Sequence, residues 1–333
     1  MFATDLASIL GDALTQAFGP EAVVFAIAAI GLNIHFGYTG LLNFGQVGFM
    51  LMGAYGLGIG IAIWDQTWWL SIFIGVLFSL ALALVLGFPT LRLRADYLAI
   101  VTIAAAEILR LIARSKPMRG ITRGAEGLNE WAGPFQEMTP WQETTYDFGP
   151  LTYTKMQVFV VVFGWLLVAL LVGFVYLLMT SPWGRVLKAI REDEDAARAL
   201  GKNAYWYKMQ SLMIGGVIGG FAGMLQVIGK GTVQPDTFVP QITFFAWTVL
   251  ILGGAGRVFS PVVGAMLFWF LLTIAEGLLR MLVETEWLPR SMLSATDIGD
   301  FRFMFVGLAL MLLMIFRPQG IFGDRAEMAL DDH

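Results

Sequence analysis

The residues best suited to chemistry or recognition lie together in one charged segment, SPWGRVLKAIREDEDAARALGKNAYWYK, residues 181–208. Its centre is an acidic run followed by two alanines and then a glycine: Glu192, Asp193, Glu194, Asp195, Ala196, Ala197 and Gly201. Elsewhere the sequence shows no nucleophile with a matching base, no catalytic pair of carboxylates and no set of metal ligands. There is no cysteine, and the two histidines are His35 and His333, so thiol chemistry, disulfides and metal sites built on cysteine are excluded. The pattern favours a contact surface rather than a catalytic centre.

This segment requires a helix to position it. Ser181 followed by Pro182 predicts a helix start, with a capping hydroxyl and then a residue of preset φ at the first helical position. Gly201 fits a helix stop. Apolar residues recur at spacings of three and four between them, at Val186, Leu187, Ile190, Ala197 and Leu200. We expect a short amphipathic helical element, for which a solvated connector is the alternative.

The composition identifies the setting of this element as a membrane. Hydrophobic residues make up 57% of the 333 residues and charged residues 14%, whereas soluble domains carry about 25% charge. A disordered, fibrous or disulfide-stapled chain is therefore excluded. The net charge of −4 gives no indication of nucleic-acid binding.

Apolar windows predict an all-α, polytopic membrane helix bundle of about nine spans, with eight or ten as alternatives. The clearest is Met156–Met179, which has no charged residue. The others are Ala22–Tyr38, Gly45–Trp64, Trp69–Phe88, Tyr97–Ala113, Met209–Gly229, Ile242–Gly256, Pro261–Leu279 and Phe303–Phe316. We therefore expect an N-terminal extramembrane or interfacial segment (1–20), a single transmembrane domain (21–323) and a tail (324–333). The N-terminal stretch does not resemble a cleaved signal, because it lacks a basic start and a long apolar run.

Basic residues in short loops set the expected orientation. Residues 181–208 contain Arg185, Lys188, Arg191, Arg198, Lys202 and Lys208. Arg92 and Arg94 lie in another short turn, and no Lys or Arg precedes the first span. Placing both basic loops in the cytoplasm gives an N-terminus outside and a C-terminus inside. Residues 114–155 then form a longer outer loop of mixed charge.

Polar residues within spans are costly and are therefore candidates for a translocation pathway. Asn33 lies near the end of the first expected span, and Asn43 and Gln46 lie beside a glycine-rich turn, residues 37–45. Amides there suit a zwitterionic solute, but they equally suit bonding to unwound backbone. Glu107 either lines the path or pairs with Arg110 three residues on. His35 is interpreted as a satisfied polar residue.

Glycines repeat every four residues in the window 209–229, where Gly215, Gly219 and Gly223 form one row. Such a row allows close helix approach in lipid, so we predict helix packing, with a subunit contact or moving seam as the alternative. The glycines of 253–256 precede no Gly-Lys-Ser/Thr, and nucleotide binding by this chain is excluded.

The order acid-Ala-Ala, then Gly, resembles the "EAA" loop of ABC importer permeases. The wider chain is similar to the LivM-type branched-chain amino acid permeases in five stretches that occur in family order. They are Gly31–Tyr55, Leu91–Arg110, Ser181–Asn203, Thr248–Ala265 and Phe316–Gly323. Residues 122–130 (TRGAEGLNE) match only in part, since Arg123 replaces the first glycine of the family's Thr-Gly-Gly-x-x-Gly.

The resemblance implies a permease subunit in a bacterial inner membrane that moves a small polar solute inward, most closely a branched-chain or related amino acid, by ATP-driven alternating access. It implies that 181–208 is a cytoplasmic coupling loop. Its implied partners are two ATP-binding subunits, a second related permease in a heterodimer, an extracytoplasmic substrate-binding protein and membrane lipid, with no cofactor and no metal. A urea or amide permease of the same superfamily and an ion-coupled secondary transporter are the alternatives.

Overall fold

The computed structural model describes residues 2–93, 95–129, 131–139, 145–149 and 151–284, and scattered positions from 299 to 323: 299, 301, 303–304, 307–308, 311–312, 315–317 and 319–323. Its long helices run in chain order α1 (Phe2–Ala17), α2 (Pro20–Thr39), α3 (Gln46–Ala62), α4 (Trp68–Thr90), α5 (Ala95–Arg114), α8 (Lys155–Thr180), α11 (Ala204–Lys230), α12 (Gln241–Gly253) and α13 (Ser260–Glu284). The expected span 303–316 and the tail 324–333 lie partly and wholly outside the described residues.

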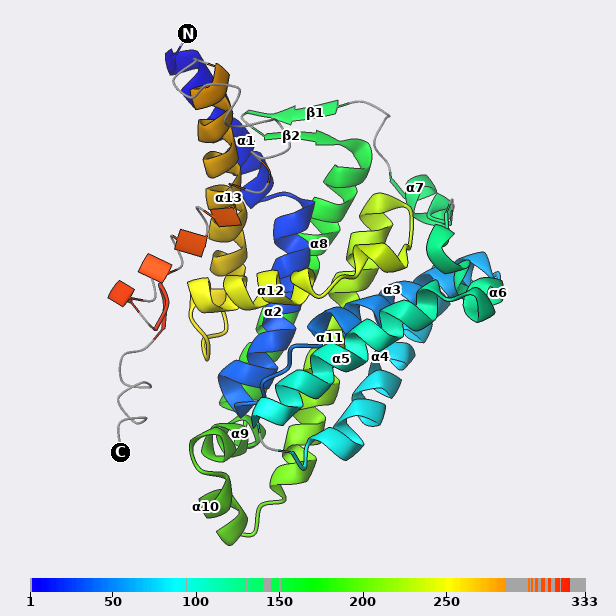
Figure 1. Ribbon diagram of the computed structural model, residues 1–333, viewed down its shortest axis with the longest axis vertical. Coiled ribbons are helices and arrows are strands. Elements are labelled where there is room, and N and C mark those ends of the chain that lie inside the picture. The colour runs from blue at the N-terminus through cyan, green and yellow to red at the C-terminus, as the bar shows by residue number, and fades with distance from the viewer. Residues whose placement is uncertain are drawn as a thin grey trace.

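Short elements connect these helices. Between α5 and α8 lie η1 (Lys116–Met118), α6 (Arg119–Thr122), η2 (Gly124–Glu126), α7 (Gly133–Glu137), β1 (Thr145–Phe148) and β2 (Leu151–Thr154), and η3 (Pro235–Thr237) precedes α12. Between α8 and α11 lie α9 (Pro182–Glu192) and α10 (Glu194–Ala199). Figure 1 shows the β1–β2 hairpin and the α9–α10 pair at opposite ends of the long axis.

The helices form the expected bundle, and the expected count of about nine spans is not confirmed by the described residues. Within the described residues, six helices are long and apolar enough to cross a membrane, α2, α4, α8, α11, α12 with η3, and α13, and α3 is a shorter apolar helix. The expected span 97–113 forms helix α5, which carries charges at Asp96, Glu107, Arg110 and Arg114.

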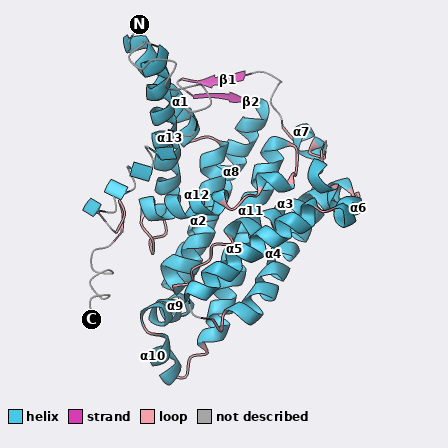
Figure 2. Cartoon of the chain, in the orientation of Figure 1, coloured by secondary structure: helices cyan, strands magenta, loops and turns pink. Residues whose placement is uncertain are grey.

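The fold departs from an all-helical bundle at the antiparallel hairpin β1–β2, where Thr145 pairs with Thr154 and Phe148 with Leu151 (Figure 2). The two strands lie in the expected outer loop, directly before α8. Thr154 and Gln157 then form a capping box at the start of α8.

The core forms around α2, which is buried along nearly its whole length. Helices α8, α11, α12 and α13 pack against it. Helix α3 packs mainly against α4 and α11, which also pack against each other. By contrast α4, α5 and α8 expose large apolar side chains, among them Phe88, Ile100 and Leu177. This is the pattern of helices that face lipid or another membrane subunit on one side.

Candidate functional site: a coupling loop and a buried polar hub

The charged segment forms two helices with a break between them, rather than one. Asp193 adopts an extended backbone (φ −151°, ψ 104°) and ends α9. Its carboxylate accepts hydrogen bonds from the backbone N–H groups of Asp195 and Ala196, both at 2.9 Å, and so caps α10. Gly201 follows α10 with φ +76°, the left-handed conformation of a helix stop.

Two expectations for this segment are wrong. The Ser181 hydroxyl does not cap α9, because it donates to the Leu178 carbonyl at 2.6 Å in the preceding helix. Leu200 does not join the buried stripe and is 81% exposed. The stripe ends earlier, because the break at Asp193 turns α10 away from the line of α9.

The α9–α10 corner has a buried inner face and a charged outer face. Ile190 and Ala197 pack with Ala204 in a small core of their own. Glu192, Asp195 and Ala196 are exposed beside Leu200. The corner thus has a buried alanine on its inner face and exposed acids with one large apolar side chain on its outer face.

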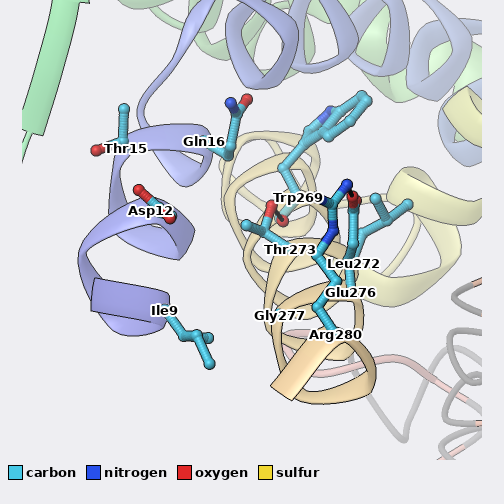
Figure 3. Close-up of a pocket in the computed structure, with 10 residues that line it drawn as sticks. All are labelled: Ile9, Asp12, Thr15, Gln16, Trp269, Leu272, Thr273, Glu276, Gly277 and Arg280. Carbon is cyan, nitrogen blue, oxygen red and sulfur yellow. Dashed lines mark hydrogen bonds and ion pairs between the residues drawn. The ribbon is translucent and has the colours of Figure 1, made fainter. Parts of the chain in front are cut away.

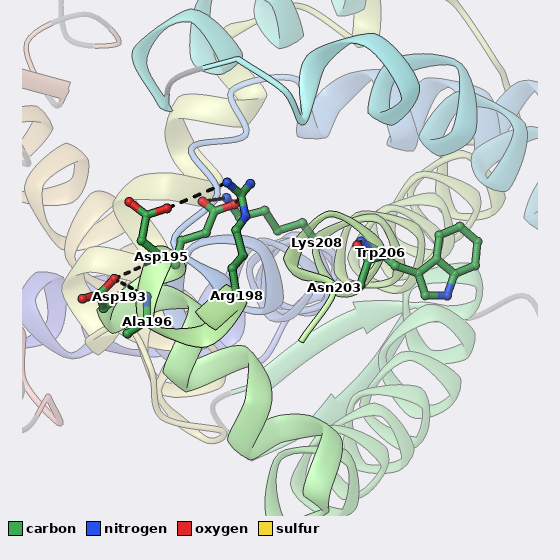
Figure 4. A network of polar contacts seen from close by, with 8 residues as sticks. Asp193, Asp195, Ala196, Arg198, Asn203, Trp206 and Lys208 are labelled. Carbon is green, nitrogen blue, oxygen red and sulfur yellow. Dashed lines mark hydrogen bonds and ion pairs between the residues drawn. The ribbon is translucent and has the colours of Figure 1, made fainter. Parts of the chain in front are cut away.

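Glu194 joins this corner to helix α11. Figure 4 shows Asp193, Asp195 and Arg198 of the corner with Lys208 of α11 nearby. The Glu194 carboxylate pairs with Arg198 on α10 at 2.6 Å and with Lys208 on α11. Lys208 is only 15% exposed, so this second pair is less screened by solvent than a surface pair.

Arg191 makes a second link, from α9 to the end of α2. Its guanidinium donates to the carbonyl of Gly37. Its stem lies over Gly40, where an added Cβ would be 3.3 Å from Arg191 Cγ. A cation at a helix C-terminus is favoured by the helix dipole and by the free carbonyls there. A cavity of about 370 Å³ lies beside this link and is lined by Thr39, Leu98, Ile190 and Lys208, among others.

The amides and the histidine of the first two expected spans are all buried, and we call these four residues the polar hub: Asn33, His35, Asn43 and Gln46. His35, Asn43 and Gln46 meet in one hydrogen-bonded cluster. Each is at most 1% exposed. Asn43 Nδ2 lies 3.0 Å from His35 Nδ1 and donates to Gln46 Oε1 at 3.1 Å. His35 Nε2 lies 3.2 Å from the Leu212 carbonyl of α11. Donation from Asn43 requires the ring proton to be on Nε2, which then donates to Leu212.

The hub lies at a break in the helix, residues 40–45, which unwinds between α2 and α3. Gly40 ends α2 with φ +72°. Side chains satisfy the freed backbone: Asn43 Oδ1 accepts from the Gly45 N–H at 2.8 Å, Thr102 Oγ1 from the Phe44 N–H at 3.0 Å, and Trp247 Nε1 donates to the Asn43 carbonyl at 3.0 Å. Unwound backbone persists at membrane depth only when it is satisfied in this way.

Asn33 extends the hub to the turn between α12 and α13. Its Nδ2 donates to the Arg257 carbonyl at 2.8 Å, and its Oδ1 accepts from the Gly256 N–H at 2.9 Å. The hub therefore connects α2, α3, α11 and the α12–α13 turn. Its residues bind backbone groups inside the protein. None of them lines the cavity beside Arg191.

Glu107 is not brought into the hub. Its two oxygens accept from Arg110 Nε and Nη2 at 2.9 and 2.6 Å, the three-residue pair that the sequence offered as one possibility. Arg110 also donates to Asp236 of η3 at 2.8 Å. This network fastens the C-terminal half of α5 to the loop between α11 and α12.

The α11 glycines lie where neighbouring helices are closest. A Cβ at Gly215 would collide with His35 and the Gly31 carbonyl, one at Gly219 with the Gln46 amide, and one at Gly223 with the Met50 carbonyl. Their lack of side chains thus gives the hub its room.

Several of these partners could not be found from the sequence. Arg191 stood out only as one of six basic residues, and Thr243, whose Oγ1 accepts from the Val47 N–H at 2.9 Å, gave no signal. Within the described residues no group of His, Cys, Asp and Glu could hold a metal ion.

The chain is similar in sequence to known transport proteins. Residues 20–316 match the family model described as "Branched-chain amino acid transport system / permease component". The chain is 30% identical over 309 residues to the high-affinity branched-chain amino acid transport system permease protein LivM of Salmonella typhimurium, which covers 90% of this chain and 68% of the relative.

Two further relatives are more distant. A probable branched-chain amino acid transport permease protein LivM of Methanocaldococcus jannaschii is 26% identical and covers 91% of each chain. The nucleoside ABC transporter permease protein NupC of Lactococcus lactis subsp. cremoris is 27% identical, covering 68% of this chain and 70% of the relative. No solved structure matches the chain.

Proposed function

Because the chain belongs to the branched-chain amino acid permease family of ABC transporters, we propose that it imports branched-chain or related aliphatic amino acids by ATP-driven alternating access. The family consists of transport subunits and not enzymes, so the chain is a permease in a multi-pass inner-membrane setting. One observation carries the mechanism: an exposed acidic corner, α9–α10, is bonded directly to the helices that surround the polar hub.

The corner is the proposed docking site for the ATP-binding subunits. Glu192, Asp195, Ala196, Leu200 and Gly201 present its outer face, whereas Asp193, Glu194 and Ala197 shape it from within. Force applied at the corner has two routes into the membrane, through Glu194 and Lys208 to α11 and through Arg191 to α2. Both helices contact the hub, and we expect the chain to bend at the unwound segment between α2 and α3.

The proposed assembly follows from the family. It contains two ATP-binding subunits, a second related permease, so that the membrane core is a heterodimer, and a substrate-binding protein on the outer side. In this arrangement α9–α10 faces the cytoplasm and the β1–β2 hairpin faces outward, with the N-terminus outside and the C-terminus inside. The basic residues of 181–208 support that orientation.

The identity of the transported solute is tested by uptake measurements. A relative is named as a nucleoside permease, so membership of the family alone leaves the solute open. Competition of labelled leucine uptake by valine, uridine and urea in cells expressing the complete importer distinguishes these classes. Competition by valine alone supports the proposal, and competition by uridine or urea alone contradicts it.

The docking assignment is tested by the double substitution Glu192→Lys and Asp195→Lys. These two exposed acids neither cap α10 nor reach α11, so the corner itself should stay folded. Reversed charge against a complementary surface costs several kcal/mol, and we expect co-purification of the ATP-binding subunit to fall at least about tenfold, with loss of uptake.

The matched control is Glu126→Lys, an exposed acid in the outer loop that pairs with Arg119. It should leave both measurements unchanged, and membrane levels of all variants should be equal by immunoblot. Undiminished binding of the ATP-binding subunit in the double variant would show that the acidic corner is not the docking site.

A further inference from the structure

A cavity of about 290 Å³ lies near the hairpin end of the molecule, opposite the acidic corner. Its walls come from the end of α1, the start of α2, strand β2, the start of α8 and the end of α11. Ligand pockets commonly begin at about 300 Å³, so this volume suits a small solute. None of the hub residues lines it.

The cavity contains one acid and one base that are only loosely paired. Glu21 Oε1 and Lys230 Nζ are 3.9 Å apart, which is too far for a hydrogen bond between them. Both side chains are partly exposed, at 34% and 44%. A carboxylate and an ammonium held at this distance keep most of their hydrogen-bonding capacity for a third group.

A buried amide adds to these charges. Gln226 lines the cavity and is only 6% exposed, yet its Oε1 has no hydrogen-bond partner among the described residues. Buried polar atoms of this kind are rare unless a ligand or water satisfies them. Glu21 and Gln226 thus supply acceptors, while Lys230 supplies donors.

The remaining wall is apolar. Val24, Val160 and Leu225 line the cavity and are almost fully buried. On the hairpin side Tyr153 closes it, and its hydroxyl donates to the Thr15 carbonyl at 2.7 Å. Burial raises the pKa of Tyr153 to about 12, so this hydroxyl stays protonated and fixed at neutral pH.

We propose that this cavity binds an aliphatic α-amino acid as its zwitterion. The ammonium would lie between Glu21 and Gln226 Oε1, the carboxylate at Lys230, and the aliphatic side chain against Val24 and Val160. The site rests on the proposed function and deepens it, because it places an outward-facing substrate position in the permease itself.

A neighbouring cavity is less suited to a zwitterion. It measures about 410 Å³ and lies between α1 and α13, with Asp12, Glu276 and Arg280 in its lining (Figure 3). Arg280 is already paired with Glu276 at 2.6 Å, and Asp12 adds a second acid. Its excess of negative charge does not match a neutral zwitterion.

The test measures binding to the assembled permease complex in lipid nanodiscs, without the substrate-binding protein. Radiolabelled leucine is the probe, and the competitors are leucinamide, which lacks the carboxylate, and 4-methylpentanoate, which lacks the ammonium. We expect saturable leucine binding that Lys230→Gln and Glu21→Gln each weaken at least about tenfold, the loss of one charged contact.

The analogues give a readout that a structural role would not change. Lys230→Gln should reduce the preference for leucine over leucinamide, and Glu21→Gln the preference for leucine over 4-methylpentanoate. The controls are Arg119→Gln and Glu126→Gln, an exposed pair in the outer loop, which should change neither affinity nor preference.

Absence of leucine binding in the wild-type complex would overturn the site, as would variants whose analogue preferences match the wild type. If the same complex still imports leucine when the binding protein is added, the proposed function stands and only this site fails. If it imports no amino acid at all, the proposed function fails first.

Discussion

At the residue scale, the three buried amides of the hub each bond to backbone groups of the protein. The amides Asn33, Asn43 and Gln46 could be identified because polar side chains are costly in a span, and the glycine-rich turn indicated unwound backbone beside them. Their partners could not be identified. Asn33 bonds to a turn 223 and 224 residues away along the chain, and nothing in residues 253–257 marks Gly256 or Arg257 as that partner.

At this scale the tightest packing makes a sharp prediction. Gly223→Ala places a methyl group against the Met50 carbonyl and should destabilise the protein by about 1–3 kcal/mol, the usual cost of overpacking. The measurement is thermal unfolding of the complex in detergent. Gly173→Ala is the control, since a Cβ there meets nothing within 4 Å, and it should leave the melting temperature unchanged or slightly raised. Equal melting temperatures for the two variants would contradict the close approach of α11 and α3.

Among the elements, the acidic corner was predictable at its ends and not at its centre. Pro182 opens α9, and Gly201 follows α10 in a left-handed conformation, as their residue types indicate. The break at Asp193 gave no signal, because Asp193 and Asp195 are both able to cap a helix and only the buried contacts of Ile190 and Ala197 decide between them. The same contacts leave Leu200 outside the core.

A substitution can break the contact between the acidic corner and α2 without changing the surface proposed to dock the ATP-binding subunits. Arg191→Gln removes the guanidinium that reaches Gly37 on α2 but leaves the acidic outer face intact. We expect the ATP-binding subunits to bind normally and to hydrolyse ATP, while leucine imported per ATP falls at least about tenfold, since a charged hydrogen bond contributes about 1.5–3 kcal/mol. The assay compares uptake and phosphate release in the same proteoliposomes.

Arg198→Gln is the matched control, because Arg198 pairs only within α10, with Glu194 and Asp195. It should retain the wild-type ratio. An unchanged ratio in Arg191→Gln would exclude the α2 route and leave Glu194 and Lys208 as the path of coupling. Loss of ATP-binding subunits in Arg191→Gln would instead assign this arginine to docking.

At the scale of the whole molecule, apolar length predicted the class and most helices but not the span count. Helix α5 occupies the expected window, yet its Glu107, Arg110 and Arg114 are ionised groups held by Asp236 and by each other. Helix α12 has only 13 residues. The hairpin was missed because its strands are four residues each, too short for an alternating pattern to stand out in a mixed-charge loop.

Orientation is the property of the whole molecule that a single experiment decides. The chain has no cysteine, so one introduced thiol reports its own side of the membrane without background. Lys202 follows α10, and Thr145 begins β1. Figure 1 shows these two elements at opposite ends of the molecule, so Lys202→Cys and Thr145→Cys report on the two ends. A membrane-impermeant maleimide should label Thr145→Cys in intact cells and Lys202→Cys only after the membrane is opened. The reason is that short loops rich in Lys and Arg, such as 181–208, stay on the cytoplasmic side. The reverse result would invert the proposed topology and remove the acidic corner from reach of any cytoplasmic ATP-binding subunit.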